Sequence, residues 1–264
     1  MMAARKMLVV MAVMVAFTAV CRGEVVPLER AHSHNDYEHE RPLLDALDHG
    51  FCSVEADINF IDGKLLVAHS PRETKPEKTL EALYLEPLRA RIKENGGKVY
   101  GSENQFWLLI DIKGNGRRTW PVLNNALKQY ADILTSYNGN KVTPGAVSVV
   151  VDNADRAIAA EQVRYAAVDG RLEDLDQDIP VNLMPWISAS WQDTFSWDAK
   201  GPIPPEELEK LREIVKKVHG QGKKLRFWAL PNPLVVWPVL YEEGVDFLNA
   251  DSQPMLRDFL LERK

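Results

Sequence analysis

Short, unbroken apolar runs recur along this chain, and stretches with helical spacing separate them. Runs that are continuous rather than alternating are typical of parallel strands that are covered on both faces. We predict eight such strands, at Leu28–His32, Cys52–Ile58, Phe106–Ile112, Ala146–Val151, Tyr165–Val168, Val181–Ile187, Leu225–Leu230 and Val245–Ala250. Eight strands alternating with helices are the pattern of an α/β chain that closes into a (β/α)8 TIM barrel.

The intervening segments support this arrangement. We predict helices at Arg41–His49, Leu80–Asn95, Thr119–Tyr137, Pro204–Gly220 and Pro233–Glu243, one that begins near Ala154, and one after Pro254. A turn at Asp62-Gly63 predicts a short hairpin extension, Lys64–His69, after the second strand. An open doubly wound sheet is the alternative, but it would carry a glycine-rich phosphate loop after the first strand, and none is present.

The N-terminal segment has a different character from the rest. Arg5 and Lys6 precede an apolar run, Met7–Val20, and small or polar residues follow it. This is the layout of a secretory signal, and the run is shorter than the ~20 residues of a membrane span. We therefore predict a signal peptide over residues 1–23, a single domain over 24–264, and a secreted or periplasmic protein. Acylation of Cys21, which would give an outer-surface lipoprotein, is the alternative.

Composition excludes one class of partner. The chain is 45% hydrophobic and 27% charged, with a formal net charge of −6. This is an ordinary globular balance, and no basic stripe suggests a nucleic-acid-binding protein. Nothing in the pattern implies a stable protein partner.

Acidic residues gather at the predicted strand ends. Glu55 and Asp57 are two apart near the end of the second strand, so both face the same side. Two buried carboxylates repel each other unless they share a cation or a proton. Asp111, at the end of the third strand, adds a third oxygen ligand. We predict a site for one divalent cation, Mg²⁺ or Ca²⁺; a solvated acidic strand end is the alternative.

Two histidines lie next to these acids in the predicted barrel. His32 ends the first strand and His69 ends the hairpin extension. An imidazole can accept or donate a proton near neutral pH, so we predict that this pair performs proton transfers. Lys113 shares a face with Asp111, where its ammonium can stabilise developing negative charge or simply hold the carboxylates as an ion pair.

Five stretches carry a family resemblance: AHSHND, SVEADI, LLVAHS, LLIDIK and FLNADSQP. Together they resemble the glycerophosphodiester phosphodiesterase and phosphatidylinositol-phospholipase-C-like superfamily, which includes the sphingomyelinase D enzymes. The resemblance implies that His32 and His69 are catalytic and that Lys113 contacts the phosphate. It implies metal ligation by Glu55, Asp57 and Asp111, and we expect the substrate to contact His34, Asn35, Trp228 and Asp251.

Departures from the family pattern concern the substrate. The glycerophosphodiesterase branch usually has His-Arg-Gly where this chain has His32-Ser33-His34, and often Glu where Asp111 stands. The implied activity is that of a secreted, metal-dependent phosphodiesterase. Its substrate would be a small-molecule or lipid phosphodiester, of the glycerophosphodiester or phospholipid-headgroup type. Two nucleophiles fit the sequence: water, or a neighbouring hydroxyl of the substrate, which would give a cyclic phosphate. We expect Trp191 and Trp197 to be able to line a pocket for a sugar, glycerol or lipid headgroup.

Two other functions fit parts of the pattern. His32-x-His34 also resembles the metal sites of amidohydrolase and polymerase-and-histidinol-phosphatase barrels. Those sites need further histidines after later strands, and beyond His69 this chain has only His219, in a predicted helix. A barrel that binds a lipid or another ligand without turnover is the non-enzymatic alternative.

Overall fold

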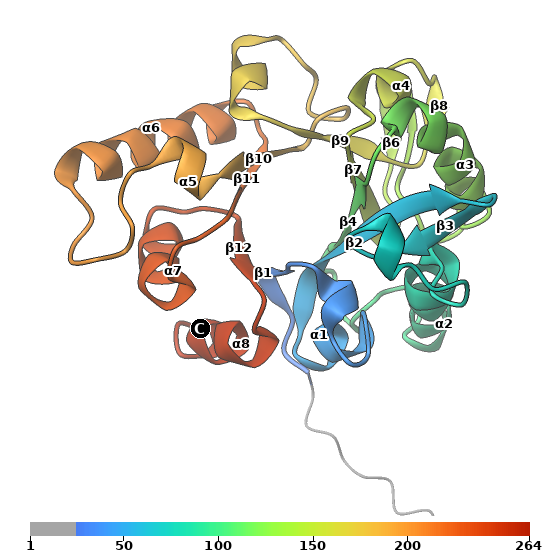
Figure 1. The fold of residues 1–264 in the computed structure, drawn as a ribbon, viewed down its shortest axis with the longest axis horizontal. Helices are drawn as coiled ribbons and strands as arrows, with labels where there is room; N and C mark the ends of the chain where they lie inside the picture. The colour runs from blue at the N-terminus through green and yellow to red at the C-terminus, as the bar shows by residue number, and fades with distance from the viewer. Residues whose placement is uncertain (1–24) are drawn as a thin grey trace, which may run out of the picture.

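The computed structural model describes residues 25–264, in which eight parallel strands close into a barrel with helices between them (Figure 1). The strands are β1 (Leu28–Ser33), β2 (Phe51–Ile61), β4 (Phe106–Ile112), β7 (Val147–Asp152), β9 (Ala167–Gly170), β10 (Trp186–Ser190), β11 (Lys224–Trp228) and β12 (Phe247–Ala250). They follow the order β1-β12-β11-β10-β9-β7-β4-β2, and the ring closes because β1 also pairs with β2. The predicted TIM barrel is confirmed. The predicted signal peptide lies outside the described residues.

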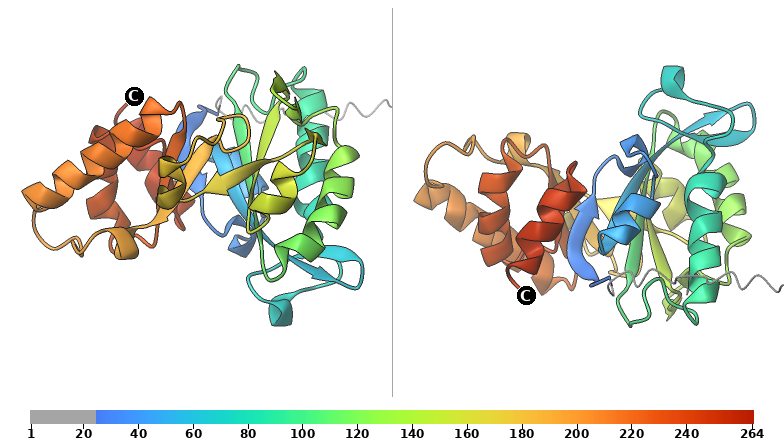
Figure 2. Two further views of the ribbon diagram at one scale, coloured as in Figure 1. Left: turned by 90° about the horizontal axis from the view of Figure 1, so that it is seen from above. Right: turned by 90° about the horizontal axis from the view of Figure 1, so that it is seen from below.

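Two additions decorate the ring. Strand β3 (Lys64–Val67) runs antiparallel to β2 and forms the predicted hairpin, which extends beyond the barrel in Figure 2. Strands β5 (Ser136–Asn138), β6 (Lys141–Thr143) and β8 (Val163–Arg164) form a separate small sheet.

Helices surround the barrel. They are α1 (Leu44–Asp48), α2 (Glu86–Glu94), α3 (Gly116–Lys128), α4 (Asp155–Ala159), α5 (Trp191–Thr194), α6 (Pro205–Gly220), α7 (Pro233–Glu242) and α8 (Gln253–Leu261). The prediction for α3 was wrong at both ends. The helix begins three residues earlier, because the side chain of Asn115 accepts a hydrogen bond from the backbone of Arg118. It ends at Lys128, where turns lead into β5.

Two strands lie a few residues further along the chain than predicted. The predicted strand Val181–Ile187 is observed at Trp186–Ser190, because the backbone amides of Leu183 and Met184 both donate to the carbonyl of Pro180 and so form a turn. The weak strand predicted at Tyr165–Val168 is observed at Ala167–Gly170. Within residues 25–264, no helix has the length and apolar character needed to span a bilayer.

Side chains alternate between the two faces of each barrel strand. On β4, Phe106, Leu108 and Ile110 pack outward against the helices, whereas Trp107 and Leu109 point into the ring. The interior is filled by Leu109, Val150, Trp186 and Phe247, and the rings of the last two have centroids 4.3 Å apart. These apolar side chains fill the barrel below the polar residues at its mouth.

Candidate active site

The carboxyl ends of the barrel strands surround a cavity of about 400 Å³. Its lining comes from seven of the eight barrel strands and the loops that follow them, and from the β2–β3 hairpin: His34, Asn35, Glu55, His69, Leu109, Asp111, Lys113, Asp152, Asp169, Arg171, Ser188, Arg226, Trp228 and Ala229. Chemistry at this end of the strands is what the barrel fold predicts.

Three carboxylates converge at one side of this cavity. Glu55, Asp57 and Asp111 each offer an oxygen, and the three oxygens lie within 4.8 Å of one another. The register explains this, because Asp57 and Asp111 are Cα partners across β2 and β4. Burial raises the pKa of Asp57, and its Oδ1 has no hydrogen-bond partner among the described residues. An unpaired buried oxygen within an acidic triad fits a hard divalent cation, which could be held here.

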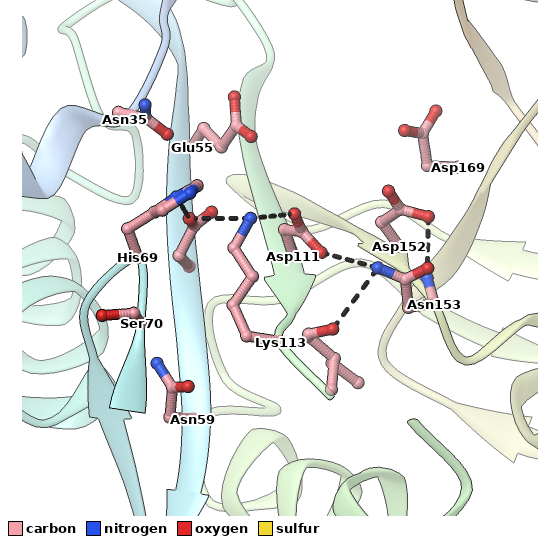
Figure 3. Close-up of polar contacts among 12 residues, drawn as sticks. Asn35, Glu55, Asn59, His69, Ser70, Asp111, Lys113, Asp152, Asn153 and Asp169 are labelled. Carbon is pink, nitrogen blue, oxygen red and sulfur yellow. Dashed lines mark hydrogen bonds and ion pairs between the residues drawn. The ribbon is translucent and has the colours of Figure 1, made fainter. Parts of the chain in front are cut away.

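Lys113 bridges two of these acids. Its Nζ lies 2.9 Å from Oδ2 of Asp57 and 2.6 Å from Oδ2 of Asp111. Figure 3 shows Lys113 pointing toward Asp111. Burial alone would lower the pKa of Lys113, but the bonds to Asp111 and Asp57 raise it above its ordinary value. The lysine is therefore an ammonium ion that partly neutralises the triad.

Glu55 is stabilised from the opposite side. Its Oε2 accepts a hydrogen bond of 2.8 Å from Nη2 of Arg226, a side chain that is itself buried. Burial alone would raise the pKa of Glu55, but Arg226 and His32 outweigh this effect and hold it well below the ordinary value. Glu55 is therefore ionised in the folded protein.

In each of the two histidines that line the cavity, the ring nitrogen Nδ1 bonds an aspartate. Nδ1 of His69 lies 2.9 Å from Oδ2 of Asp57, and Nδ1 of His34 lies 2.6 Å from Oδ1 of Asp251. In neither ring does Nε2 bond another described residue. A histidine held at Nδ1 by a carboxylate has a fixed orientation, and its second nitrogen is left for a substrate.

His32 does not line the cavity. Its ring is fully buried below Glu55, with Nδ1 2.8 Å from the Ser53 hydroxyl and Nε2 3.3 Å from Glu55. Desolvation, followed by the charge of Arg226, lowers the pKa of His32 to about 3. His32 therefore does not reach the cavity, whereas His34, two residues further along the chain, lines it. Among the described residues, the group that could hold a metal ion is acidic and includes neither His32 nor His34.

Of the remaining residues expected to contact the substrate, some lie at the cavity and others do not. Asn35 and Trp228 line the cavity, and Asp251 orients His34 at its edge. Trp191 and Trp197 do not line it: both are buried, with Trp191 stacked against Phe195 at a centroid distance of 4.2 Å. The expectation that these two tryptophans line the pocket was therefore wrong, because aromatic packing encloses them.

Sequence reasoning missed the opposite wall. Arg171 lies between two acids there, with Nη2 bonded to Oδ2 of Asp152 and Nη1 3.1 Å from Oδ2 of Asp169. Asp152 is the Cα partner of Asp111 across β4 and β7, so three aspartates follow one another around the ring. The signal was available, because Asp152 ends the apolar run of β7 just as Asp111 ends that of β4.

Comparison with known proteins gives a consistent picture. A family model described as an AIM6-like phosphodiesterase domain matches residues 19–167. The altered inheritance of mitochondria protein 6 homolog of Arthroderma benhamiae is 31% identical, over 89% of this chain and 84% of that protein. A protein of the same name from Eremothecium gossypii is 30% identical, over 89% of this chain and 70% of its own length.

Solved structures agree on the fold. A phosphodiesterase from Oleispira antarctica, in complex with the product sn-glycerol-3-phosphate, matches with a TM-score of 0.54 and 15% identity, over 88% of this chain and 96% of that one. A glycerophosphodiester phosphodiesterase from Parabacteroides distasonis matches with a TM-score of 0.50 and 13% identity, over 91% and 99%. These likenesses show the fold, a TIM barrel like that of these two phosphodiesterases.

Proposed function

This chain belongs to the family of AIM6-like phosphodiesterase domains, and from that premise we propose that it is a divalent-metal-dependent phosphoric diester hydrolase. The observation that carries the proposal is one cavity in which an acidic triad faces two histidines, each oriented by an aspartate. The product bound to the Oleispira enzyme supports a small-molecule or lipid phosphodiester as the substrate.

The acidic side of the cavity binds the phosphate in this proposal. Glu55, Asp57 and Asp111 would hold one cation, Mg²⁺ or Ca²⁺, whose chemistry is to neutralise a non-bridging phosphate oxygen as a Lewis acid. Lys113, already an ammonium beside two of these carboxylates, donates to a second phosphate oxygen. Arg226 keeps Glu55 ionised and so ready to ligate.

The two cavity histidines perform the proton transfers. Through its free Nε2, one ring takes the proton of the nucleophile, which is either water or a neighbouring hydroxyl of the substrate. The other ring, as imidazolium, gives its Nε2 proton to the leaving alcohol oxygen. The bonds to Asp57 and Asp251 favour a proton on Nδ1, which leaves Nε2 of the neutral ring as the acceptor.

Hydrolysis of bis(p-nitrophenyl) phosphate tests this function. We expect turnover that a chelator abolishes and added Mg²⁺ or Ca²⁺ restores. His34→Ala and His69→Ala should each lower kcat by about 10²–10⁴-fold, the usual contribution of general acid–base catalysis. His219→Ala is the matched control, because His219 also pairs with an aspartate, Asp246 at 2.8 Å, but on the outside of the barrel.

Three outcomes would overturn this scheme. Full activity in chelator would show that the reaction needs no metal ion. Full activity of His34→Ala would show that His34 transfers no proton and would favour His32 in that role. No turnover of any phosphodiester by the metal-loaded wild type would favour a barrel that only binds its ligand.

We also propose that the mature protein acts outside the cytoplasm. The support is the sequence alone: Arg5 and Lys6 followed by the apolar run Met7–Val20. N-terminal sequencing of the exported protein should give Glu24 as the first residue, whereas a lipidated Cys21 at the N-terminus would establish the lipoprotein form.

A further inference from the structure

The hydroxyl of Tyr37 contacts the acidic triad, although Tyr37 does not line the cavity. The residue is 7% exposed and lies in the short 3-10 helix η1 (Asp36–Glu38) that follows β1. Its hydroxyl lies 2.7 Å from Oδ2 of Asp57, 3.0 Å from Oδ1 of Asn35 and 3.4 Å from Nδ1 of His69. Asn35 and His69 line the cavity above it. The proposed mechanism gives this buried hydroxyl no task.

The single proton of the hydroxyl decides which of these contacts is a donated hydrogen bond. A phenol, with an ordinary pKa of about 10, carries that proton at neutral pH. The carboxylate of Asp57 is the nearest of the three partners and a strong acceptor, so the hydroxyl donates to it. The phenol oxygen can then accept, more weakly, from Nδ1–H of His69. This is the tautomer that the bond between His69 and Asp57 also favours.

The two carboxylate oxygens of Asp57 have different surroundings. Oδ2 lies close to three donors: the Tyr37 hydroxyl, Nδ1 of His69 and Nζ of Lys113. Oδ1 is buried and bonds no other described residue. Asp57 would therefore hold a cation through Oδ1, while Oδ2 carries the contacts that orient His69. Tyr37 is the donor to Oδ2 that also contacts the ring of His69 itself.

The ring of His69 depends on these contacts because little else fixes it. Its side chain is 61% exposed, so packing alone does not hold the ring in one orientation. Within residues 25–264, the hydrogen-bonding partners of the ring are Asp57 and Tyr37. Which ring nitrogen carries the proton is set by the bond that the other makes. A group that transfers protons also needs one orientation, since small misplacements are costly.

Tyr37 is itself firmly anchored by the residue before it. The carboxylate of Asp36 is fully buried. It accepts hydrogen bonds of between 2.8 and 3.0 Å from three buried side chains of different elements: Ser33, Tyr84 and Gln253. The same short stretch, residues 34–37, also contains His34, the other histidine that lines the cavity. Tyr37 therefore joins His69 to the segment that bears His34.

We propose that Tyr37 is a positioning residue, whose hydroxyl sets the orientation of the His69 ring relative to His34. The catalytic consequence rests on the proposed function, whereas the ring orientation does not. His34 follows β1, and His69 follows β3 of the hairpin, outside the ring of parallel strands. The hydroxyl of Tyr37 links these two elements, so that the two rings keep one arrangement across the cavity.

Nitrogen-15 NMR of the imidazole rings tests the orientation without requiring activity. At pH 8, where a free imidazole is neutral, His69 of the wild type should show one main tautomer, protonated at Nδ1. Tyr37→Phe keeps the buried ring and removes the hydroxyl, so the His69 signals should move part of the way toward the average of the two tautomers. The His34 signals should stay unchanged. His69→Ala assigns the signals.

Tyr100→Phe is the matched control for this experiment. Tyr100 is also a buried tyrosine, 4% exposed, but its hydroxyl donates a bond of 2.6 Å to the carbonyl of Phe51, at the start of β2. The start of β2 lies at the end of the barrel opposite the cavity, so this variant should leave both histidines unchanged. Circular dichroism verifies that each variant is folded.

Kinetics distinguishes positioning from a merely structural role. Tyr37→Phe should lower kcat for bis(p-nitrophenyl) phosphate about ten-fold, as the loss of a partner of a metal-site ligand commonly does. KM should stay unchanged, because Tyr37 does not line the cavity. A structural role would lower the melting temperature without separating kcat from KM. Tyr100→Phe should leave both constants unchanged.

The outcomes separate this inference from the proposed function. Unchanged His69 signals or unchanged kcat in Tyr37→Phe overturn it, as does a loss confined to KM or an equal effect of Tyr100→Phe. The ring protons of Tyr37 and His69 should also show a nuclear Overhauser effect in the wild type, and its absence contradicts the contact even if the variant does not fold. Shifted His69 signals in a protein without turnover would overturn the hydrolase and keep the ring orientation. Turnover with unchanged signals would do the reverse.

Discussion

At the scale of single residues, the cavity balances charge that burial makes costly. Desolvation raises the pKa of Asp169 to about 7; the charge of Asp152 acts in the same direction, while Arg171, Arg226 and the Ser188 hydroxyl oppose it. The five side chains come from β7, β9, β10, β11 and the residue after β9. Without the fork of Arg171, the wall would place two unpaired carboxylates side by side.

The raised pKa of Asp169 predicts a pH dependence of stability. In the unfolded chain this carboxyl ionises near its ordinary pKa of about 4, whereas in the folded chain it keeps its proton up to about pH 7. Its contribution to the free energy of unfolding is therefore complete below pH 4 and is lost progressively between pH 4 and pH 7. We expect the free energy of unfolding of the wild type, relative to Asp169→Asn, to be about 2.5 kcal/mol lower at pH 8 than at pH 5, at ~1.4 kcal/mol per pH unit. Urea denaturation at both values measures this, and an unchanged difference would contradict the shift.

The same scale shows where sequence reasoning stops. His32 and His34 are two apart, so the alternation of a strand places both on the inner face, and the motif does not distinguish them. The two rings differ in their position along the barrel axis. The strand ends at Ser33, so His34 lies just beyond it at the mouth of the barrel, whereas His32 lies within the strand, below Glu55. Alternation identified Glu55 and Asp57, and the end of the predicted strand identified both rings, but the sequence did not show which ring lines the cavity.

At the scale of elements, the β2–β3 hairpin delivers one of the two cavity histidines. His69 follows β3, outside the ring of parallel strands. Buried Asn59 on β2 holds the end of β3, because its Nδ2 donates a bond of 2.7 Å to the carbonyl of Ala68, the residue before His69. Together with the backbone bond from the amide of Ala68 to the carbonyl of Asp57, this contact positions His69.

Asn59→Ala should weaken catalysis without touching the substrate. Loss of the bond to Ala68 should lower kcat for bis(p-nitrophenyl) phosphate about ten-fold, since small misplacements of a catalytic group are costly. Stability should fall by about 1–3 kcal/mol, because the buried carbonyl of Ala68 loses its partner. Asn138→Ala, at an exposed position on β5, is the control. Unaltered kcat in Asn59→Ala would show that the hairpin holds His69 by other means.

Elements differ in how well the sequence specifies them. Strand β4 was predicted at its observed bounds, because FWLLIDI is apolar almost throughout and both strand faces are covered. The region of Val181 was misassigned because its apolar residues lie next to Pro180, whose carbonyl nucleates a turn instead of a strand. Local composition fixes buried strands well, whereas turns depend on backbone hydrogen bonds that the pattern does not show.

At the scale of the whole molecule, the acidic triad couples cation binding to the stability of the barrel. Glu55 and Asp57 lie on β2 and Asp111 lies on β4, so a shared cation would join two neighbouring strands. Any ligand that binds the folded but not the unfolded chain adds to stability by mass action. The cation should therefore stabilise the fold as well as the site.

Thermal unfolding with and without the cation measures this coupling. A cation at one hundred times its Kd adds ~2.7 kcal/mol, which raises Tm by about 5–10 °C for a chain of this size. Glu55→Gln should reduce the shift sharply, whereas Glu94→Gln, at an exposed position on α2, should keep it. No rise in Tm with either Mg²⁺ or Ca²⁺ would count against a metal site.

The bond between His34 and Asp251 crosses the seam where the first barrel strand meets the last, and its partners are 217 positions apart. A ribosome therefore makes the imidazole long before the carboxylate that orients it. While the chain is still being synthesised, it holds the three acids and His69 but lacks the second oriented ring. Under the proposed function, the order of translation itself keeps an unfinished chain from attacking phosphodiesters inside the cell that produces it.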